Sequence, residues 1–200
     1  MPVIGYSVYM KKFEFHQVTT RGGDRGETSL ADGERRRKDD LLFNTLGSID
    51  ELNSQLGLVR AHLRLEPEAV QSEFSRTGGD LLAIQTNLQV IGGMTAVPRR
   101  SKLFDTMQRT GPAEIEELEK QEMALMQHTA IPQRFVQPGE TVLSANIHVA
   151  RTVCRRSERF LVSCIRERGL DHLVSGQQYL NRLADYLFIM ALWYEQNREV

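Results

Sequence analysis

The sequence contains no long hydrophobic run, only two cysteines and almost no net charge. No stretch reaches the roughly 18 apolar residues that a membrane helix needs, so no segment is predicted to span a membrane. The N-terminal region lacks a long apolar core and does not look like a secretory signal. The formal net charge of -1 argues against a dedicated nucleic-acid-binding protein. With 40% hydrophobic and 26% charged residues, the composition is that of a globular protein, and we expect a cytoplasmic location.

The two cysteines, Cys154 and Cys164, fall within one predicted helix. At a rise of about 1.5 Å per residue their backbones are roughly 15 Å apart, which is too far for a disulfide. No C-x-x-C pair is present that could bind a metal. We therefore expect two buried thiols in a reducing compartment.

Three motifs that carry well-known chemistry are also absent. The G-x-x-x-x-G-K-[ST] nucleotide-binding loop and the G-x-S-x-G turn of serine hydrolases do not occur. None of the 5 histidines has a glutamate three residues before it, as a di-iron helical bundle requires. The sequence predicts no metal ligands.

The segment Thr20–Asn53 is the most informative part of the chain. It combines small, hydroxyl-bearing and basic residues, in the order Gly22, Gly23, Gly26, Thr28, Ser29 and the run Arg35–Lys38. Glycines let backbone N–H groups approach an anion closely, and hydroxyls and cations add donors. Such a loop before a helix can hold a polyphosphate, but its composition alone favours an ordinary polar loop.

Apolar residues recur at helical spacing in five segments that are joined by short links. We expect helices over residues 38–62, 67–91, 113–128, 140–168 and 173–197, with Gly92 and Gly93 ending the second and Gly169 the fourth. This pattern predicts an all-α, five-helix bundle with an N-terminal glycine-rich loop. Residues 20–200 are expected to form one domain. Residues 1–19 are expected to form an extension, with a strand or ordered arm over 6–15.

The fourth predicted helix carries two apolar stripes and a charged face. One stripe holds Leu143, Ile147, Ala150, Cys154 and Leu161, and the neighbouring one holds Val142, Ala145, Val149, Val153 and Phe160. The remaining face holds His148, Arg151, Arg155, Glu158 and Arg159. Periodicity alone favours a solvated polar face, whereas forked guanidinium groups also suit an anion site.

Polar residues on two other helices can complete such a site. In the first helix Asn53 is in register with apolar positions, and Asp50 nearby is a natural partner for Arg151. In the fifth helix one face holds Asn181, Asp185 and Phe188. Because a buried Asn or Asp needs a hydrogen-bond partner, these residues form either a structural network or a ligand-facing wall.

Three segments in order resemble the PduO-type ATP:cob(I)alamin adenosyltransferases. TRGGDRGETSLADGERRRKDD is similar to the family's T-R-T-G-D-x-G-x-T-S-L…G-E-R-x-x-K-D-D. GSIDELNSQLGLVRA follows, and then HVARTVCRRSERFLV with YLNRLADYLF. The resemblance extends over nearly everything from Thr20 to Tyr194.

The resemblance implies a homotrimer of five-helix bundles with active sites at the subunit interfaces. It implies transfer of the 5′-deoxyadenosyl group of ATP to the cobalt of reduced cob(I)alamin, with adenosylcobalamin and triphosphate as products. Mg²⁺ would accompany ATP. An electron donor that reduces the corrinoid and an adenosylcobalamin-dependent enzyme are the further partners to expect.

By motif position, the implied ATP site comprises Thr20, Arg21, Gly22, Gly23, Thr28, Ser29, Lys38, Arg155, Arg156, Ser157, Glu158, Arg159 and Asn181. Arg155 and Glu158 are the implied catalytic residues of this set. They are joined by Asp50 and Arg151, which match a family ion pair on the corrin side. Phe135 matches an aromatic residue that keeps the lower axial face of cobalt free of a ligand, and Phe188 belongs to the same cofactor-binding set.

The sequence departs from the family pattern at two places. Gly22 replaces a usual Thr, and FVQPGE replaces F-x-L-P-G-G, so that Gln137 and Glu140 alter the contacts near Phe135. Two other functions remain open. One is a non-catalytic bundle that binds ATP or cobalamin as carrier or sensor. The other is a bundle that binds proteins through Arg35–Lys38.

Overall fold

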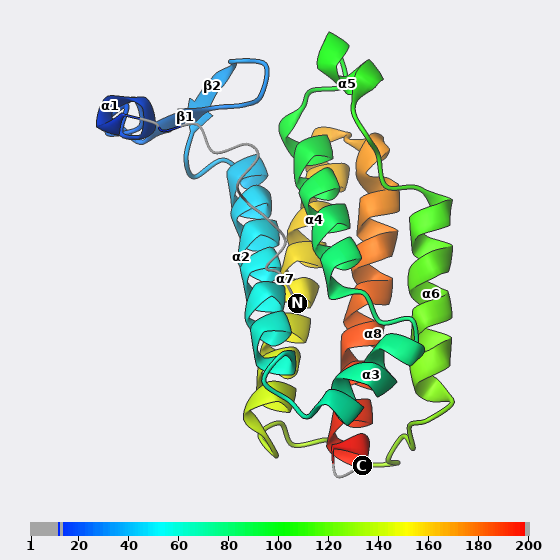
Figure 1. Cartoon of the computed structure of the whole chain (residues 1–200). Coiled ribbons are helices and arrows are strands. Elements are labelled where there is room, and N and C mark those ends of the chain that lie inside the picture. Colours follow the sequence, from blue (N-terminus) through cyan, green and yellow to red (C-terminus); the bar gives the residue numbers. More distant parts are fainter. Residues whose placement is uncertain (1–11, 13, 199–200) are drawn as a thin grey trace.

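Five long helices run side by side in the computed structural model, which describes residues 12 and 14–198 (Figure 1). They are α2 (Leu41–Leu63), α4 (Leu81–Ala96), α6 (Pro112–Met126), α7 (Val142–Arg168) and α8 (Val174–Asn197). α7 packs against both α2 and α8, while α4 packs against α2 and α6 against α8. The predicted all-α five-helix bundle is confirmed. None of the helices in this described part is both long and apolar enough to cross a membrane.

Shorter elements lie at the two ends of the bundle. α3 (Glu68–Arg76) crosses the end near the C-terminus, and α5 (Lys102–Thr106) lies at the opposite end (Figure 1). The 3-10 helix η2 (Asp171–Leu173) leads into α8, and α1 (Phe15–Val18) precedes the glycine-rich segment. Most of the arm predicted over residues 6–15 lies outside the described residues.

The second predicted helix was wrong in its extent, because residues 67–91 form two helices. The helix is interrupted between Arg76 and Leu81, where Gly78 adopts a positive φ of 78° that favours glycine. Asp80 then caps α4 by accepting hydrogen bonds from the N–H groups of Leu82 and Ala83. Gly92 and Gly93 do not end α4, which continues to Ala96.

The glycine-rich segment was expected to be a loop, but it contains a short antiparallel hairpin. β1 (Glu27–Ser29) pairs with β2 (Arg35–Arg37), with Thr28 opposite Arg36. Gly33 has a φ of 87°, which closes the turn between the strands. Three-residue strands carry too little alternation to be recognised in the sequence.

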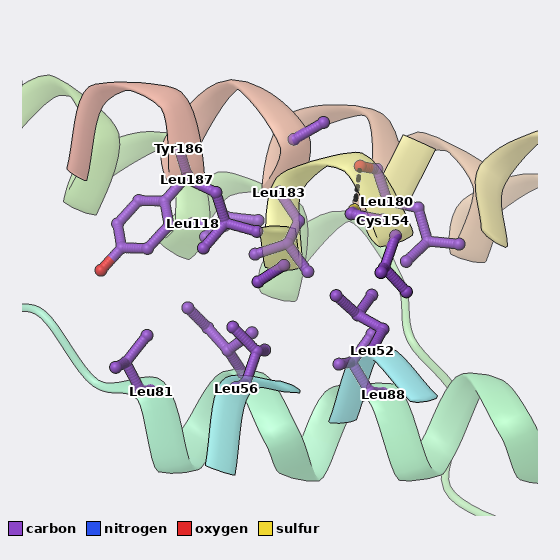
Figure 2. Packing of buried hydrophobic residues seen from close by; sticks show 14 of the residues in the cluster. Leu52, Leu56, Leu81, Leu88, Leu118, Cys154, Leu180, Leu183, Tyr186 and Leu187 are labelled. Atoms are coloured by element: carbon purple, nitrogen blue, oxygen red, sulfur yellow. Dashed lines mark hydrogen bonds between the residues drawn. The ribbon is translucent and has the colours of Figure 1, made fainter. Parts of the chain in front are cut away.

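The core lies where α2, α4, α6, α7 and α8 meet, and Figure 2 shows their side chains facing one another. The predicted first stripe of α7 is buried from Leu143 to Leu161, but the second is only partly covered, with Val142 and Val149 exposed. Cys154 and Cys164 are free, buried thiols, as predicted. The Cys154 thiol donates to the carbonyl of Leu180 over 3.2 Å and so joins α7 to α8 (Figure 2).

Caps determine where the long helices begin and end. Asp40 accepts from the N–H of Leu42 and starts α2, while the Thr141 side chain accepts from Ser144 and starts α7. α7 ends at Gly169, whose φ of 63° is the left-handed conformation of a helix C-cap. The predicted end of this helix is therefore confirmed.

Two glycine-to-alanine substitutions should have opposite effects on stability. A Cβ at Gly79 would lie 2.4 Å from the ring of Phe74, which is itself buried and packed on Trp193. We expect Gly79→Ala to lower the free energy of unfolding by about 1–3 kcal/mol through overpacking. A Cβ at Gly92 would meet nothing within 4 Å. Gly92→Ala should therefore raise that free energy by about 0.5–1 kcal/mol, because α4 continues through it.

Urea denaturation followed by circular dichroism measures both changes on one scale. Equal destabilisation by both substitutions would contradict the continuous α4.

Candidate functional site

The glycine-rich loop folds back on the last residue of the basic run. A Cβ at Gly23 would lie 2.8 Å from Lys38 Nζ, so a side chain there would displace the lysine. Arg21 has a φ of 55°, the only positive value of a non-glycine residue in the described chain. The Arg35 guanidinium donates to the carbonyl of Gly22 over 2.9 Å. The loop therefore holds a strained backbone next to the amino group of Lys38.

The three arginines of the basic run are already paired with acids. The ion pairs are Arg35–Glu27 at 3.4 Å, Arg36–Glu34 at 2.8 Å, Arg36–Asp40 at 3.4 Å and Arg37–Asp39 at 2.7 Å. Lys38 has no acidic partner among the described residues. The only cation of the run that is open to an anion in this part of the chain is therefore Lys38.

The hairpin is tied to the segment that follows α4. The N–H of Ala31 donates to the carbonyl of Ala96 over 3.3 Å, and Arg100 pairs with Glu34 at 2.7 Å. Leu30 between the strands is buried in the bundle core. These contacts hold the loop at the α5 end of the bundle.

Some residues of the predicted ATP-site set on α7 are exposed to solvent, whereas others contact α2. Arg155 and Arg159 are exposed, and the Arg159 guanidinium donates to the carbonyl of Arg155 over 3.1 Å. Arg156 instead pairs with Glu51 of α2. Ser157 is fully buried, and its hydroxyl lies 2.7 Å from that of Ser48 in the contact with α2. Arg155 and Arg159 are thus the cations of this predicted set that α7 presents outward.

A polar chain connects α7 with α8 and α6. The Asn181 amide donates to Glu158 over 3.4 Å, and Arg182 donates to Asn181 over 2.7 Å and to Glu119 over 2.6 Å. Asn181 and Glu158, both predicted for the ATP site, therefore lie together. Arg182 and Glu119 were not predicted, and neither has a signal in the sequence beyond its charge.

Three of the residues predicted for the corrin side, Phe135, Arg151 and Phe188, lie toward the other end of the bundle. Phe135 is 99% exposed on the segment between α6 and α7. That segment and α8 line a cavity of about 510 Å³, which includes Phe135, Gln137, Glu140 and Glu195. An exposed aromatic ring beside a cavity of this size is suited to stack against a flat ligand.

Arg151, Phe188 and His148 form a group near this cavity. The Arg151 guanidinium lies 6.0 Å from the centre of the Phe188 ring, and its Nε has no hydrogen-bond partner in the described chain. Burial, with Arg155 nearby, lowers the pKa of Arg151. His148 was expected on the polar face, but it is buried, and neither ring nitrogen has a hydrogen-bond partner among the described residues.

Asp50 and Arg151 lie on different faces of the chain. Asp50 lines a cavity of about 240 Å³ between α2 and α4, together with Asn53 and Gly92. Arg151 faces α8 through Phe188. No ion pair joins Asp50 to Arg151 within the described residues of one chain.

The loop and the arginine face do not meet within one chain either. Arg168 pairs with Asp40 at 3.2 Å, so the C-terminal end of α7 lies beside the glycine-rich segment. Arg155 lies roughly 20 Å further along the axis of α7, counted at about 1.5 Å per residue. The residues predicted for the ATP site therefore form two separate surfaces.

Comparisons with known proteins agree with the motifs. The family model described as cobalamin adenosyltransferase matches residues 18–194. A corrinoid adenosyltransferase of Citrobacter freundii is 38% identical over 176 residues, which cover 88% of this chain and 93% of the relative. Human corrinoid adenosyltransferase MMAB is 35% identical over 181 residues, which cover 88% of this chain and 67% of the relative.

Solved structures show the same fold. A variant PduO-type ATP:corrinoid adenosyltransferase from Lactobacillus reuteri, complexed with cobalamin and ATP, superposes with a TM-score of 0.72 at 27% identity. The superposition covers 88% of this chain and 92% of that one. A second variant complexed with ATP also gives 0.72, at 29% identity, over 91% of this chain and 95% of its own.

The buried His148 should make stability depend on pH. Burial and the nearby Arg151 lower its pKa below the ordinary value, although Glu195 opposes this. As pH falls through about 6.5, the unfolded chain takes up a proton that the folded chain does not. The free energy of unfolding should therefore decline from about pH 7.5 down to the lowered pKa, below which this contribution stays constant.

His148→Phe removes the group and should reduce this decline, as measured by urea unfolding at pH 7.5 and 5.5. An unchanged decline in the variant would show that His148 does not titrate in this way.

Proposed function

The chain belongs to the cobalamin adenosyltransferase family, and on this premise we propose how its two site surfaces act. The protein is an enzyme, an ATP:corrinoid adenosyltransferase. It transfers the 5′-deoxyadenosyl group of ATP to the cobalt of reduced cob(I)alamin. Adenosylcobalamin forms and triphosphate leaves.

The observation that carries the site proposal is the separation of the loop from the arginine face. Lys38 and the glycine backbone lie at one end of the bundle, and Arg155 lies roughly 20 Å away along α7. We infer that the two surfaces of a single chain do not hold one ATP molecule together. A neighbouring copy that brings its loop to Arg155 would complete the site.

We propose that the assembly is the homotrimer, with the ATP site between subunits. Asp50 and Arg151 support this, because they face different directions in one chain and a partner copy could pair them. Val142 and Val149 add exposed apolar surface on α7 that an interface would cover. Closed rotational symmetry then repeats the same loop-to-α7 contact at every interface.

Catalysis rests on positioning and electrostatics. Cob(I)alamin is itself a strong nucleophile, so the protein must align cobalt with the 5′ carbon of ATP. Arg155, Arg159, Lys38 and the loop amides neutralise the charge that develops on the leaving triphosphate. Glu158, which accepts from Asn181, orients this polar face. Thr20, Thr28 and Ser29 supply hydroxyl donors around the phosphates.

On the corrin side, Phe135 and Phe188 form the apolar surroundings of the cobalt. Phe135 is fully exposed and its segment lines the cavity of about 510 Å³. An apolar ring below the cobalt would exclude an axial ligand and so make the metal easier to reduce. Gln137 and Glu140 share this cavity, so the departures from the family pattern fall beside the corrin ring.

We propose that Mg²⁺ enters with ATP. Among the described residues, no cluster of His, Cys, Asp or Glu could hold a metal ion. Mg²⁺ commonly keeps its waters and binds substrate phosphates, which suits a site without a protein cage. The electron donor and the adenosylcobalamin-dependent acceptor belong to this proposal as partners. So does a cytoplasmic location, which two buried, unpaired thiols support.

Arg155→Ala should reduce adenosylation by about 100- to 1,000-fold, because one preorganised cation is removed from the leaving group. The side chain is exposed, so the fold should survive. The assay is anaerobic, with ATP and reduced cobalamin, and records both the Co–C bond by absorbance and the triphosphate released. Arg166→Ala, an exposed arginine near the end of the same helix, is the matched control and should retain activity.

Wild-type binding of ATP and cobalamin without Co–C bond formation would favour the carrier or sensor instead. Full activity of the Arg155→Ala protein would contradict its role.

A subunit-mixing experiment tests the shared site. Lys38→Ala disables the loop half and Arg155→Ala disables the helix half, so each homotrimer should be nearly inactive. In a trimer mixed at equal amounts, about a quarter of the interfaces combine an intact loop with an intact arginine face. Activity should therefore reappear at roughly that fraction of wild type. If both halves belonged to one chain, mixing would restore nothing.

A further inference from the structure

The segment between α4 and α6 covers a cavity of about 330 Å³ at the α5 end of the bundle. Its lining includes Arg99, Phe104, Arg109, Thr110, Asp171 and His172. None of these residues belongs to the proposed ATP or corrin surfaces. The cavity combines cations, an aromatic ring and a hydroxyl, which is the set of groups that binds a small organic anion.

Both arginines of this cavity lack an acidic partner among the described residues. Their neighbour Arg100 is different, since it pairs with Glu34 at 2.7 Å. The Arg109 guanidinium lies 5.3 Å from the centre of the Phe104 ring. Stacking of this kind orients a guanidinium without neutralising its charge. Two forked donors are therefore available to an anion.

Thr110 gives an independent sign of a missing ligand. Its side chain is only 3% exposed, and its hydroxyl has no hydrogen-bond partner in the described chain. Buried hydroxyl groups normally have a partner, because leaving one unpaired is costly. Thr110 also lines the cavity, so its unpaired hydroxyl belongs to the wall beside which an acceptor would bind.

His172 adds a group that responds to charge in the cavity. Its Nε2 lies 3.3 Å from the carbonyl oxygen of Met94, and its ring meets Phe104 edge-on at 5.1 Å. Burial and Arg99 lower the pKa of His172, while Met94 and Asp171 act in the opposite direction. A bound anion would favour the protonated ring.

We propose that this cavity binds the phosphate group of a small phosphomonoester, held by Arg99, Arg109 and Thr110. Forked guanidinium groups match the oxygens of a phosphate, and Phe104 with Met94 provides an apolar wall for the organic part. The proposal does not depend on the adenosyltransferase site.

Asp171 makes the site selective for phosphate. Its carboxylate also lines the cavity and would repel a fully ionised anion. A monoprotonated phosphate offers a P–O–H group that the carboxylate can accept, whereas sulfate has no such hydrogen. The cavity should therefore prefer phosphate over sulfate.

Calorimetric titration of the full chain, without ATP or corrinoid, tests the assignment. The probes are glycerol phosphate, inorganic phosphate and sulfate, at an ionic strength kept constant with chloride. We expect both phosphates to bind more tightly than sulfate. Arg109→Gln should weaken binding by about tenfold or more, and the near-isosteric Thr110→Val by about fivefold, since each removes a donor.

Lys102→Gln is the matched control, because Lys102 is an exposed cation of the same segment that does not line the cavity. It should bind as wild type does. Unchanged affinity in both Arg109→Gln and Thr110→Val would overturn the proposal, and so would equal affinity for sulfate.

The Arg155→Ala variant distinguishes phosphate binding in this cavity from phosphate binding at the ATP site. Phosphate binding should persist in Arg155→Ala, and the ring signals of His172 should shift on addition of phosphate in wild type but not in Arg109→Gln. Adenosylation by Arg109→Gln, measured without added phosphate, should remain at the wild-type level. Loss of phosphate binding in Arg155→Ala together with its retention in Arg109→Gln would place the anion at the ATP site and overturn the proposal.

Discussion

The packing of α7 between α2 and α8 determines the direction of every side chain on its charged face. Ser157 meets Ser48 of α2, Cys164 lies 3.1 Å from Thr45 of α2, and Cys154 donates to α8. These contacts fix the rotation of α7 about its own axis. An α-helix has 3.6 residues per turn, so when Cys154, Ser157 and Cys164 face the neighbouring helices, Arg155 points outward. The orientation of the arginines proposed for catalysis therefore depends on a core of small polar and apolar groups.

Local ion pairs determine which cationic side chains are free to bind an anionic ligand. The arginines at 35–37 each have an acidic neighbour, although such exposed pairs add little stability. Their effect is to leave Lys38 as the cation of this run that lacks an acidic partner in the described chain. A protein-binding role for the whole basic run is weakened for the same reason, because its charge is largely neutralised within the hairpin. Arg155, Arg99 and Arg109 likewise have no acidic partner in that part of the chain.

Sequence patterns located most of the fold because helical periodicity reports burial directly. The stripe from Leu143 to Leu161 predicted the buried side of α7, and Gly169 predicted its end. The helix break at Gly78 and Asp80 was not predicted, because apolar residues continue at helical spacing on both sides of it. The hairpin was missed because β1 and β2 depend on pairing with each other and on Leu30 in the core. His148 was misplaced because it lies at the edge between the charged face and the buried seam, where neighbouring α8 decides its burial.

By itself, the order of residues determined four of the five long helices, the free thiols and the family motifs, because each of these depends on spacing within one short segment. Tertiary structure alone decided that Ser157 is buried, that Arg35–Arg37 are neutralised and that Asp50 faces away from Arg151. The physical reason is that burial and pairing involve side chains far apart in the chain. The same reason explains the two separate surfaces of the ATP site. It also explains the cavity around Thr110, which is lined by residues of α4, α5, η2 and α8.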